Sequence, residues 1–256
     1  MNLYHNTIGE GEPLVILHGL FGSSDNWVSI ARKFAKNYRV ILVDLRNHGR
    51  SPHHQDWNYE LMADDVDVML QTLGLTEVHL LGHSMGGKTA MTFAAANPDT
   101  VMKLIVADIA PRHYPVHHRT ILDALTAIHL EKLKSRNEAE EILDRYISDE
   151  STKHFLLKNL YRDHRHTFAW RFNLPVINEN IEVVGEATYP AEPVQIPTLF
   201  IRGVNSDYIT DEDIMDIRQY FTNARVETLG NAGHWLHAEQ PDAFVGTVMS
   251  FLDDTE

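Results

Sequence analysis

Short apolar runs alternate with stretches of helical spacing along most of this 256-residue chain, and no other feature limits the possible fold so strongly. Runs rich in Val, Ile and Leu that extend for only a few residues are typical of strands buried on both faces, as in a parallel sheet. Such runs occupy residues 13–18, 39–45, 78–82, 103–109, 198–202 and 225–229. Between them, apolar residues recur every three or four positions at 27–34, 62–73, 91–95 and 244–252. The alternation predicts an α/β fold with a mostly parallel sheet and helices on both faces.

One long interval lacks strand-like runs of comparable strength. Between residues 112 and 192 the pattern is helical at 121–133, 138–147 and 152–160, followed by an irregular stretch that contains prolines. Open α/β sheets bind ligands beyond the carboxyl ends of their strands. We therefore expect residues 1–111 and 193–256 to form the core, and residues 112–192 to form a helical cap over the strand ends. A separate helical domain unrelated to function is the alternative.

Composition excludes several classes of protein. The formal net charge is −14, whereas nucleic acids and anionic membranes favour basic partners. No stretch approaches the roughly 20 apolar residues of a membrane-spanning helix, and the N-terminus lacks the pattern of a secretory signal. Cysteine is absent, so disulfides, thiolate metal sites and cysteine nucleophiles are excluded. We expect a cytoplasmic protein, either a monomer or a small homo-oligomer.

The segment Gly82-His83-Ser84-Met85-Gly86 follows one apolar run and precedes a helical stretch. G-x-S-x-G between a strand and a helix is the pattern of a nucleophile elbow, a turn so sharp that glycines are needed around the serine. The turn exposes the serine hydroxyl at the edge of the sheet, beside the N–H groups of the new helix. Ser84 is therefore the predicted nucleophile.

An acyl-transfer site also needs two N–H groups that stabilise the oxyanion. His18-Gly19-Leu20-Phe21-Gly22 follows the first strong strand-like run. We expect the N–H groups of Leu20 and Met85 to form the oxyanion hole, with Phe21 as a wall of the pocket. His18 is interpreted as a structural residue of its own loop.

The base must be a histidine at the same edge of the sheet. His234 lies after the last strand-like run, where the fold can bring its imidazole to Ser84. His237 is the rival, but it is predicted to pack on the first turn of a helix. His83 is a poor base because neighbouring residues project apart.

The segments HGLFGS, DLRNHGRS, GHSMGG and NAGHW, in this order and spacing, resemble those of the α/β-hydrolase superfamily. They are similar in particular to YbfF-type bacterial esterases and their mitochondrial relatives. The resemblance extends from Leu14 to Leu252 but is weak in the cap. It implies an eight-stranded, mostly parallel sheet, a Ser-His-acid triad and hydrolysis without a cofactor. The loop that contains Asp44, Arg46 and His48 is interpreted as a support for the oxyanion loop.

The acid of the triad has two candidates. In most relatives it follows the penultimate strand, in a pattern that aligns here with residues 203–210. In that register Ser206 occupies the acid's position, and Asp207 is one residue late. Asp108 ends an apolar strand beside the elbow strand, where YbfF-type esterases are expected to carry their acid. We favour Asp108 and keep Asp207 as the alternative.

These features predict a serine hydrolase that cleaves a small-molecule carboxylic ester or acyl thioester through an acyl-enzyme. A carbon–carbon hydrolase, a lyase, a cofactor-free haloperoxidase and a non-catalytic ligand receptor are the alternatives on the same frame. No metal or organic cofactor is indicated, and the histidines at 117–118 and 164–166 are interpreted as a solvated cap surface. The predicted pocket residues are Phe21, Trp170, Phe172, Leu174, Tyr189, Tyr208 and Trp235. The four in the cap, Trp170, Phe172, Leu174 and Tyr189, are equally compatible with the core of the cap.

Overall fold

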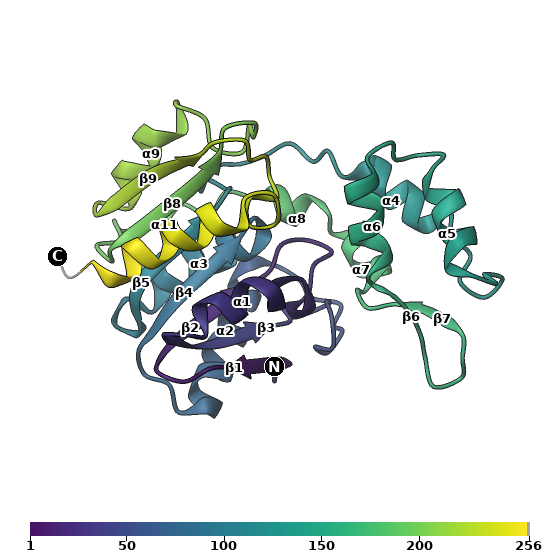
Figure 1. Ribbon diagram of the computed structural model, residues 1–256, viewed down its shortest axis with the longest axis horizontal. Coiled ribbons are helices and arrows are strands. Elements are labelled where there is room, and N and C mark those ends of the chain that lie inside the picture. The colour runs from purple at the N-terminus through teal and green to yellow at the C-terminus, as the bar shows by residue number, and fades with distance from the viewer. Residues whose placement is uncertain (255–256) are drawn as a thin grey trace.

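Seven strands form the central sheet of the computed structural model, which describes residues 1–254 (Figure 1). The order across the sheet is β1-β3-β2-β4-β5-β8-β9, and every neighbouring pair is parallel except β1 and β3. The six predicted runs are all strands of this sheet. The strands are β1 (His5–Ile8), β2 (Glu12–Leu17), β3 (Tyr38–Val43), β4 (Val78–His83), β5 (Val101–Ala107), β8 (Thr198–Gly203) and β9 (Ala224–Leu229).

The expected number of eight strands is wrong for residues 1–254, where the sheet has seven. The seventh strand is β1, a short antiparallel edge strand that the apolar pattern did not reveal because its four residues are all partly or fully exposed. Residues 1–4, which precede it, are not in a strand. In the described chain, β1 is therefore the edge of the sheet.

Helices cover both faces of the sheet. Side chains alternate along each strand, so the apolar strands present buried side chains to both faces. In β2, Val15 and Leu17 pack on one face with α2 (Tyr59–Leu73) and α3 (Met85–Ala96). Leu14 and Ile16 pack on the other face with α1 (Val28–Phe34) and α11 (Pro241–Asp253). None of the helices within residues 1–254 is long and apolar enough to cross a membrane. The remaining core helices are η1 (Ser24–Trp27), η2 (Pro98–Thr100), α9 (Asp213–Tyr220) and α10 (Leu236–Glu239).

Residues 112–192 form a lobe beside the carboxyl ends of the strands (Figure 1). Its helices are α4 (Arg119–Thr126), α5 (Arg136–Leu143), α6 (Glu150–Leu157), α7 (Leu174–Glu179) and α8 (Glu182–Gly185). The first three start two residues earlier than predicted and end sooner. The side chains of Ser135 and Asp149 cap α5 and α6 by accepting hydrogen bonds from the N–H groups of Glu138 and Thr152.

The lobe also contains a hairpin that the sequence did not predict. Its strands are β6 (Leu160–Arg162) and β7 (Phe168–Trp170), paired antiparallel. Each strand has three residues, too few to produce a periodic apolar pattern. A polar turn joins them, with His166 in the left-handed region at a φ of 60°. The irregular stretch expected after α6 therefore begins with regular structure.

Both ends of the lobe are attached to α3 through Lys88. This side chain is fully buried, and its ammonium group donates hydrogen bonds to the backbone carbonyls of Arg112, at 2.8 Å, and Glu186. The two ends also bond each other, because Thr188 N–H donates to the carbonyl of Pro111 at 2.7 Å. Burial, with a smaller contribution from the nearby Arg112 charge, lowers the pKa of Lys88 to about 7.

This pKa predicts how stability depends on pH. In the unfolded chain a lysine has a pKa of about 10.4, so the unfolded state binds more protons than the folded state between about pH 7 and pH 10. The burial cost of the Lys88 charge is therefore greatest below pH 7 and decreases as pH rises. We expect the free energy of unfolding of the wild type to increase across this range relative to that of Lys88→Met.

Urea unfolding of both proteins at pH 6, 8 and 9.5 measures this difference. Lys36→Met, which changes an exposed lysine, is the matched control and should follow the wild type. Stability curves for the wild type and Lys88→Met that run parallel across the range would contradict the prediction.

Candidate active site

Ser84 lies between β4 and α3 in a backbone conformation that few residues adopt. Its φ is 53° and its ψ is −119°, outside the regions that non-glycine residues normally occupy. Glycines make the turn possible. A Cβ at Gly82 would lie 2.1 Å from the carbonyl oxygen of Gly86, and a Cβ at Gly86 would lie 2.4 Å from that of Leu17. The tight approach holds the Ser84 side chain at the end of the strand.

The His234 imidazole lies between Ser84 and Asp108. Its Nε2 is 3.1 Å from Ser84 Oγ, and its Nδ1 is 2.8 Å from Asp108 Oδ2. The Tyr208 ring stacks on the imidazole, with ring centroids 4.0 Å apart. Burial lowers the pKa of His83 well below its usual value, so its ring is neutral. Its single ring proton is on Nε2, which donates a hydrogen bond to the carbonyl of His234 at 2.8 Å. The imidazole is thus held from its ring and from its backbone.

Asp108 is fully buried just beyond the end of β5. Besides its contact with His234, its Oδ1 accepts a hydrogen bond from Gly203 N–H at 3.1 Å, and its Oδ2 accepts one from the Ser206 hydroxyl. Its own N–H donates to the carbonyl of Ile201 at 2.8 Å. The contacts of the side chain with His234, Gly203 and Ser206 satisfy a carboxylate that would otherwise be costly to bury.

Asp207, the alternative acid, lies elsewhere. It is exposed, and its backbone carbonyl accepts a hydrogen bond from Arg112 at 3.3 Å. Ser206, one residue earlier, points at Asp108 instead. His237, the alternative base, stacks on Trp27 with ring centroids 4.0 Å apart, and burial lowers its pKa to about 3.

The loop with Leu20 packs directly on the elbow. A Cβ at Gly19 would lie 3.0 Å from His83 Nδ1 and 3.3 Å from Ser84 Cβ, so a larger residue there would require these neighbours to move. Met85 opens α3, and the N–H groups in the first turn of a helix have no partner within that helix. The N–H of Phe21 is already engaged by His48 Nε2 at 3.2 Å.

Two neutral histidines, His18 and His48, hold the loop that contains Leu20 by hydrogen bonds. His18 Nε2 accepts from Leu45 N–H at 3.0 Å, so its Nδ1 carries the proton and donates to the carbonyl of Gly19 at 2.8 Å. His48 has the same tautomer, because it accepts from Phe21 and donates from Nδ1 to the carbonyl of Arg46 at 3.0 Å. Burial lowers the pKa of both rings, that of His48 to about 3. This bonding agrees with the supporting roles expected for His18 and for the loop that contains His48.

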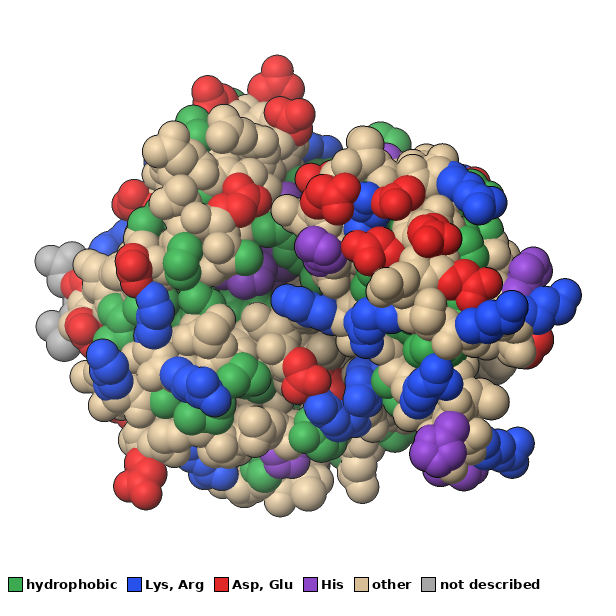
Figure 2. Space-filling view, turned by 45° about the vertical axis from the view of Figure 1, so that its right-hand side comes forward, with side chains coloured by type: hydrophobic (Ala, Val, Ile, Leu, Met, Phe, Trp, Pro, Cys, Tyr) green, Lys and Arg blue, Asp and Glu red, His purple; other side chains and the backbone are tan. Residues whose placement is uncertain are grey.

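A cavity of about 290 Å³ opens beside Ser84 and His234. Figure 2 shows apolar and histidine side chains around the hollow between the main body and the cap. Of the predicted pocket residues, Phe21, Tyr208 and Trp235 line this cavity. The cap adds Ile121, from α4, and Phe155, from α6.

The placement expected for Trp170, Phe172, Leu174 and Tyr189 over the cleft is wrong. Trp170 and Phe172 are buried, stack on each other, and fill the space behind Phe21, whose ring contacts Phe172 edge-on at 5.1 Å. Leu174 packs against the same core. Tyr189 is exposed and bonds Asp216 at 3.1 Å. Trp170 and Phe172 therefore belong to the core of the cap rather than to the surface above Ser84.

Two polar residues of the cavity, His117 and His118, are not among the residues predicted for the pocket. His117 and His118 were interpreted as solvated surface, but both line the hollow beside Ser84. His117 Nε2 lies 2.8 Å from the Tyr208 hydroxyl. Burial, with smaller effects from His117 and His234, lowers the pKa of His118 to about 4, so its ring is neutral at pH 7. The adjacent pair of histidines at the start of the cap was the available signal.

The cap also contacts the loop of residues 18–22. Asn159 is buried between the cap and the core, and its amide nitrogen donates to the carbonyl of Phe21 at 2.8 Å. Nothing in the local sequence pattern around Asn159 distinguishes it from the other polar residues of the cap.

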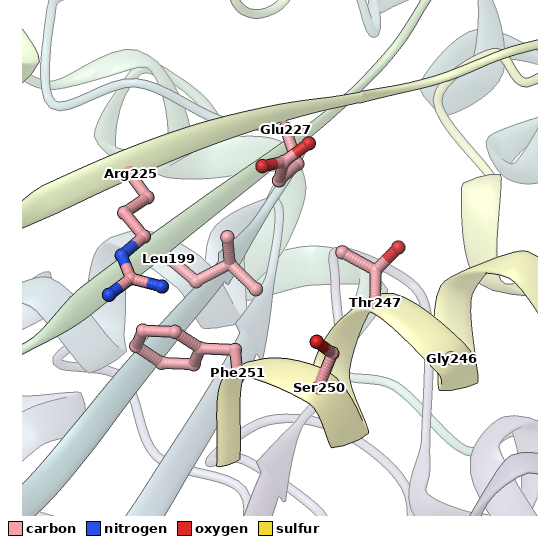
Figure 3. Close-up of a pocket in the computed structure, with 7 residues that line it drawn as sticks. All are labelled: Leu199, Arg225, Glu227, Gly246, Thr247, Ser250 and Phe251. Carbon is pink, nitrogen blue, oxygen red and sulfur yellow. The ribbon is translucent and has the colours of Figure 1, made fainter. Parts of the chain in front are cut away.

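A second hollow lies on the far edge of the sheet, between β9 and α11 (Figure 3). Its volume is about 380 Å³, and it contains a serine, Ser250, beside Thr247 and Glu227. No histidine is among its described lining residues. Its serine therefore has no imidazole beside it among the described lining residues, unlike Ser84.

Potential metal ligands come together at one place among residues 1–254. Glu140, Glu150 and His154, from α5 and α6, have ligand atoms within 4.8 Å of one another. The group is largely exposed, and the Glu150 carboxylate already pairs with Lys153 at 2.6 Å. None of the three lines the cavity beside Ser84.

Comparison with known proteins gives consistent matches. A family model described as the alpha/beta hydrolase fold matches residues 12–135. The chain is 37% identical to Esterase YbfF of Escherichia coli, over 94% of this chain and 93% of that protein. It is 38% identical to the mouse sn-1-specific diacylglycerol lipase ABHD11, over 93% and 80% of the two chains.

A solved structure extends the match to three dimensions. The chain is similar to a marine microorganism esterase with a TM-score of 0.95 and 46% sequence identity, over 98% of this chain and 99% of that one. Identity at this level across nearly the whole of both chains shows shared ancestry as well as shared shape. The chain belongs to the α/β-hydrolase family.

Proposed function

We propose that this protein is a serine hydrolase that cleaves carboxylic esters or acyl thioesters through an acyl-enzyme. The observation that carries the proposal is the unbroken series of short contacts from Ser84 Oγ through the His234 imidazole to the buried Asp108 carboxylate. Relatives described as an esterase and a diacylglycerol lipase favour the same reaction class.

In this mechanism His234 Nε2 removes the Ser84 proton as Oγ attacks the acyl carbonyl. The imidazole becomes positively charged, and the Asp108 carboxylate stabilises that charge while keeping the other ring proton on Nδ1. Because Asp108 is fully buried, water screens this attraction little.

The carbonyl oxygen becomes negative as the tetrahedral intermediate forms. We assign its stabilisation to the N–H groups of Leu20 and Met85, which cost little reorganisation because the loop and the helix already hold them. His234 then returns the proton to the leaving group. Water, activated by the same imidazole, hydrolyses the acyl-enzyme and restores Ser84.

Ser84→Ala removes the group that forms the covalent bond. We expect esterase turnover to fall to background while circular dichroism shows an unchanged fold. A fluorophosphonate probe should label the wild type and not this variant.

Ser250→Ala is the matched control, since Ser250 lies in the hollow of Figure 3 and has no histidine among the described lining residues. It should keep full activity and labelling. Near wild-type turnover in Ser84→Ala would refute the mechanism.

Asp108→Asn and Asp207→Asn separate the two candidate acids. Asp108→Asn removes the charge that balances the imidazolium and lets His234 adopt the wrong tautomer, so we expect turnover to fall by about 10² to 10⁴. Asp207→Asn alters an exposed side chain and should change turnover by less than about threefold. Steady-state kinetics on one ester measures both, and a crippled Asp207→Asn beside an active Asp108→Asn would reverse the assignment.

A further inference from the structure

Two hollows of unequal size meet at Ser84. The wider one, of about 290 Å³, is lined by His234. The narrower one, of about 20 Å³, lies on the side of Met85 and does not include His234 among its described lining residues. Both include Ser84 and Tyr208. A substrate bonded to Ser84 therefore has two places for its two substituents.

The chemistry decides which substituent goes where. The leaving-group oxygen must receive a proton from His234 Nε2, so it lies within hydrogen-bonding distance of that atom. The carbonyl oxygen points at the oxyanion hole. The remaining substituent on the carbonyl carbon is the acyl chain, and it must extend away from His234. Of the two hollows, the narrower one is the one without His234 among its described lining residues, and it is therefore the candidate for the acyl chain.

One wall of the narrower hollow, formed by Tyr114 and Gly185, is restrained by hydrogen bonds and close backbone contacts. Tyr114 is buried, and its hydroxyl accepts a hydrogen bond from Ala110 N–H at 2.8 Å and donates one to the carbonyl of Tyr208. Its N–H donates to the carbonyl of Gly185 at 2.8 Å. A Cβ on Gly185 would lie 2.2 Å from the carbonyl oxygen of Tyr114. The backbone of this wall is therefore fixed on both sides.

Size sets the limit on the acyl chain. A cavity of about 20 Å³ exceeds only slightly the roughly 10–15 Å³ needed to hold one water molecule. It has room for about one or two carbon atoms beyond the carbonyl. The wider hollow can hold a larger group, and its walls include the apolar side chains of Ile121, Phe155 and Trp235.

From this geometry we propose that the enzyme is selective for esters of acetic or propionic acid with larger apolar or aromatic alcohols. The proposal rests on the proposed serine-hydrolase function, and it assigns the short acyl group to the hollow beside Met85 and the alcohol to the hollow beside His234.

Two series of esters test the assignment. In the first, the leaving group is p-nitrophenol and the acyl chain lengthens from acetyl to octanoyl. We expect kcat/KM to fall by at least about tenfold between the propionyl and hexanoyl esters, because extra methylenes no longer fit. In the second, acetyl is constant and the alcohol grows from ethyl to benzyl and naphthyl, and kcat/KM should stay level or rise.

Matched variants test the two hollows separately. Val184→Ala enlarges only the narrower hollow, and Ile121→Ala enlarges only the wider one. Val184→Ala should raise the ratio of hexanoyl to acetyl turnover about tenfold. Ile121→Ala should leave that ratio unchanged. Both substitutions remove only a few methyl or methylene groups, and circular dichroism checks folding.

The outcomes distinguish this proposal from the one on which it rests. Absence of turnover on every ester, or turnover that survives in Ser84→Ala, would contradict the serine-hydrolase function. Ser84-dependent turnover that is level or increases with acyl length would overturn the selectivity alone. A larger change of acyl preference in Ile121→Ala than in Val184→Ala would show that the acyl chain occupies the wider hollow, and it would overturn the assignment.

Discussion

The active-site edge of this protein is organised around the negative charge of Asp108. A fully buried carboxylate is stable only if donors surround it, and the donors here come from two separate segments: the end of β8 and the turn after it, with Gly203 and Ser206, and the loop after β9, with His234. Asp108 itself has a φ of 52°, which turns the chain sharply after β5. Each of these segments is therefore held in place by the same charge that orients the imidazole.

The sheet could be predicted because most of its strands are buried on both faces. Five of the seven, β2, β3, β4, β5 and β8, appear in the sequence as nearly continuous apolar runs, whereas β9 alternates apolar and polar residues and is largely exposed. The sharp turn at Ser84 requires glycines, which the sequence shows directly. The edge strand β1 and the hairpin of β6 and β7 could not be found in the same way. Their side chains are largely exposed or their strands have only three residues, so tertiary pairing rather than composition makes them strands.

The residues of the candidate site at the ends of the strands could be predicted from the sequence, whereas those of the cap could not. Ser84, His234 and Asp108 lie at the ends of predicted strands, where the topology of a parallel sheet brings residues together, and the register of residues 203–210 already separated Ser206 from Asp207. The cap residues depend on how helices fold back over the sheet. Large aromatic side chains such as Trp170 were expected over the cleft, but burying their area in the cap core is more favourable than exposing it to a water-filled hollow.

Lys88 allows the cap to vary in length and sequence without a change in the sheet. Because one ammonium group binds the carbonyls of Arg112 and Glu186, the two ends of the insertion meet at a fixed point on α3. A loop whose ends already meet can change length at small entropic cost, about 0.6 kcal/mol for each doubling. Evolution can therefore rebuild the interior of the insertion while the sheet and the triad geometry stay constant. The hydrogen bond of Asn159 to the Phe21 carbonyl is the point where such changes in the cap would alter the loop of residues 18–22.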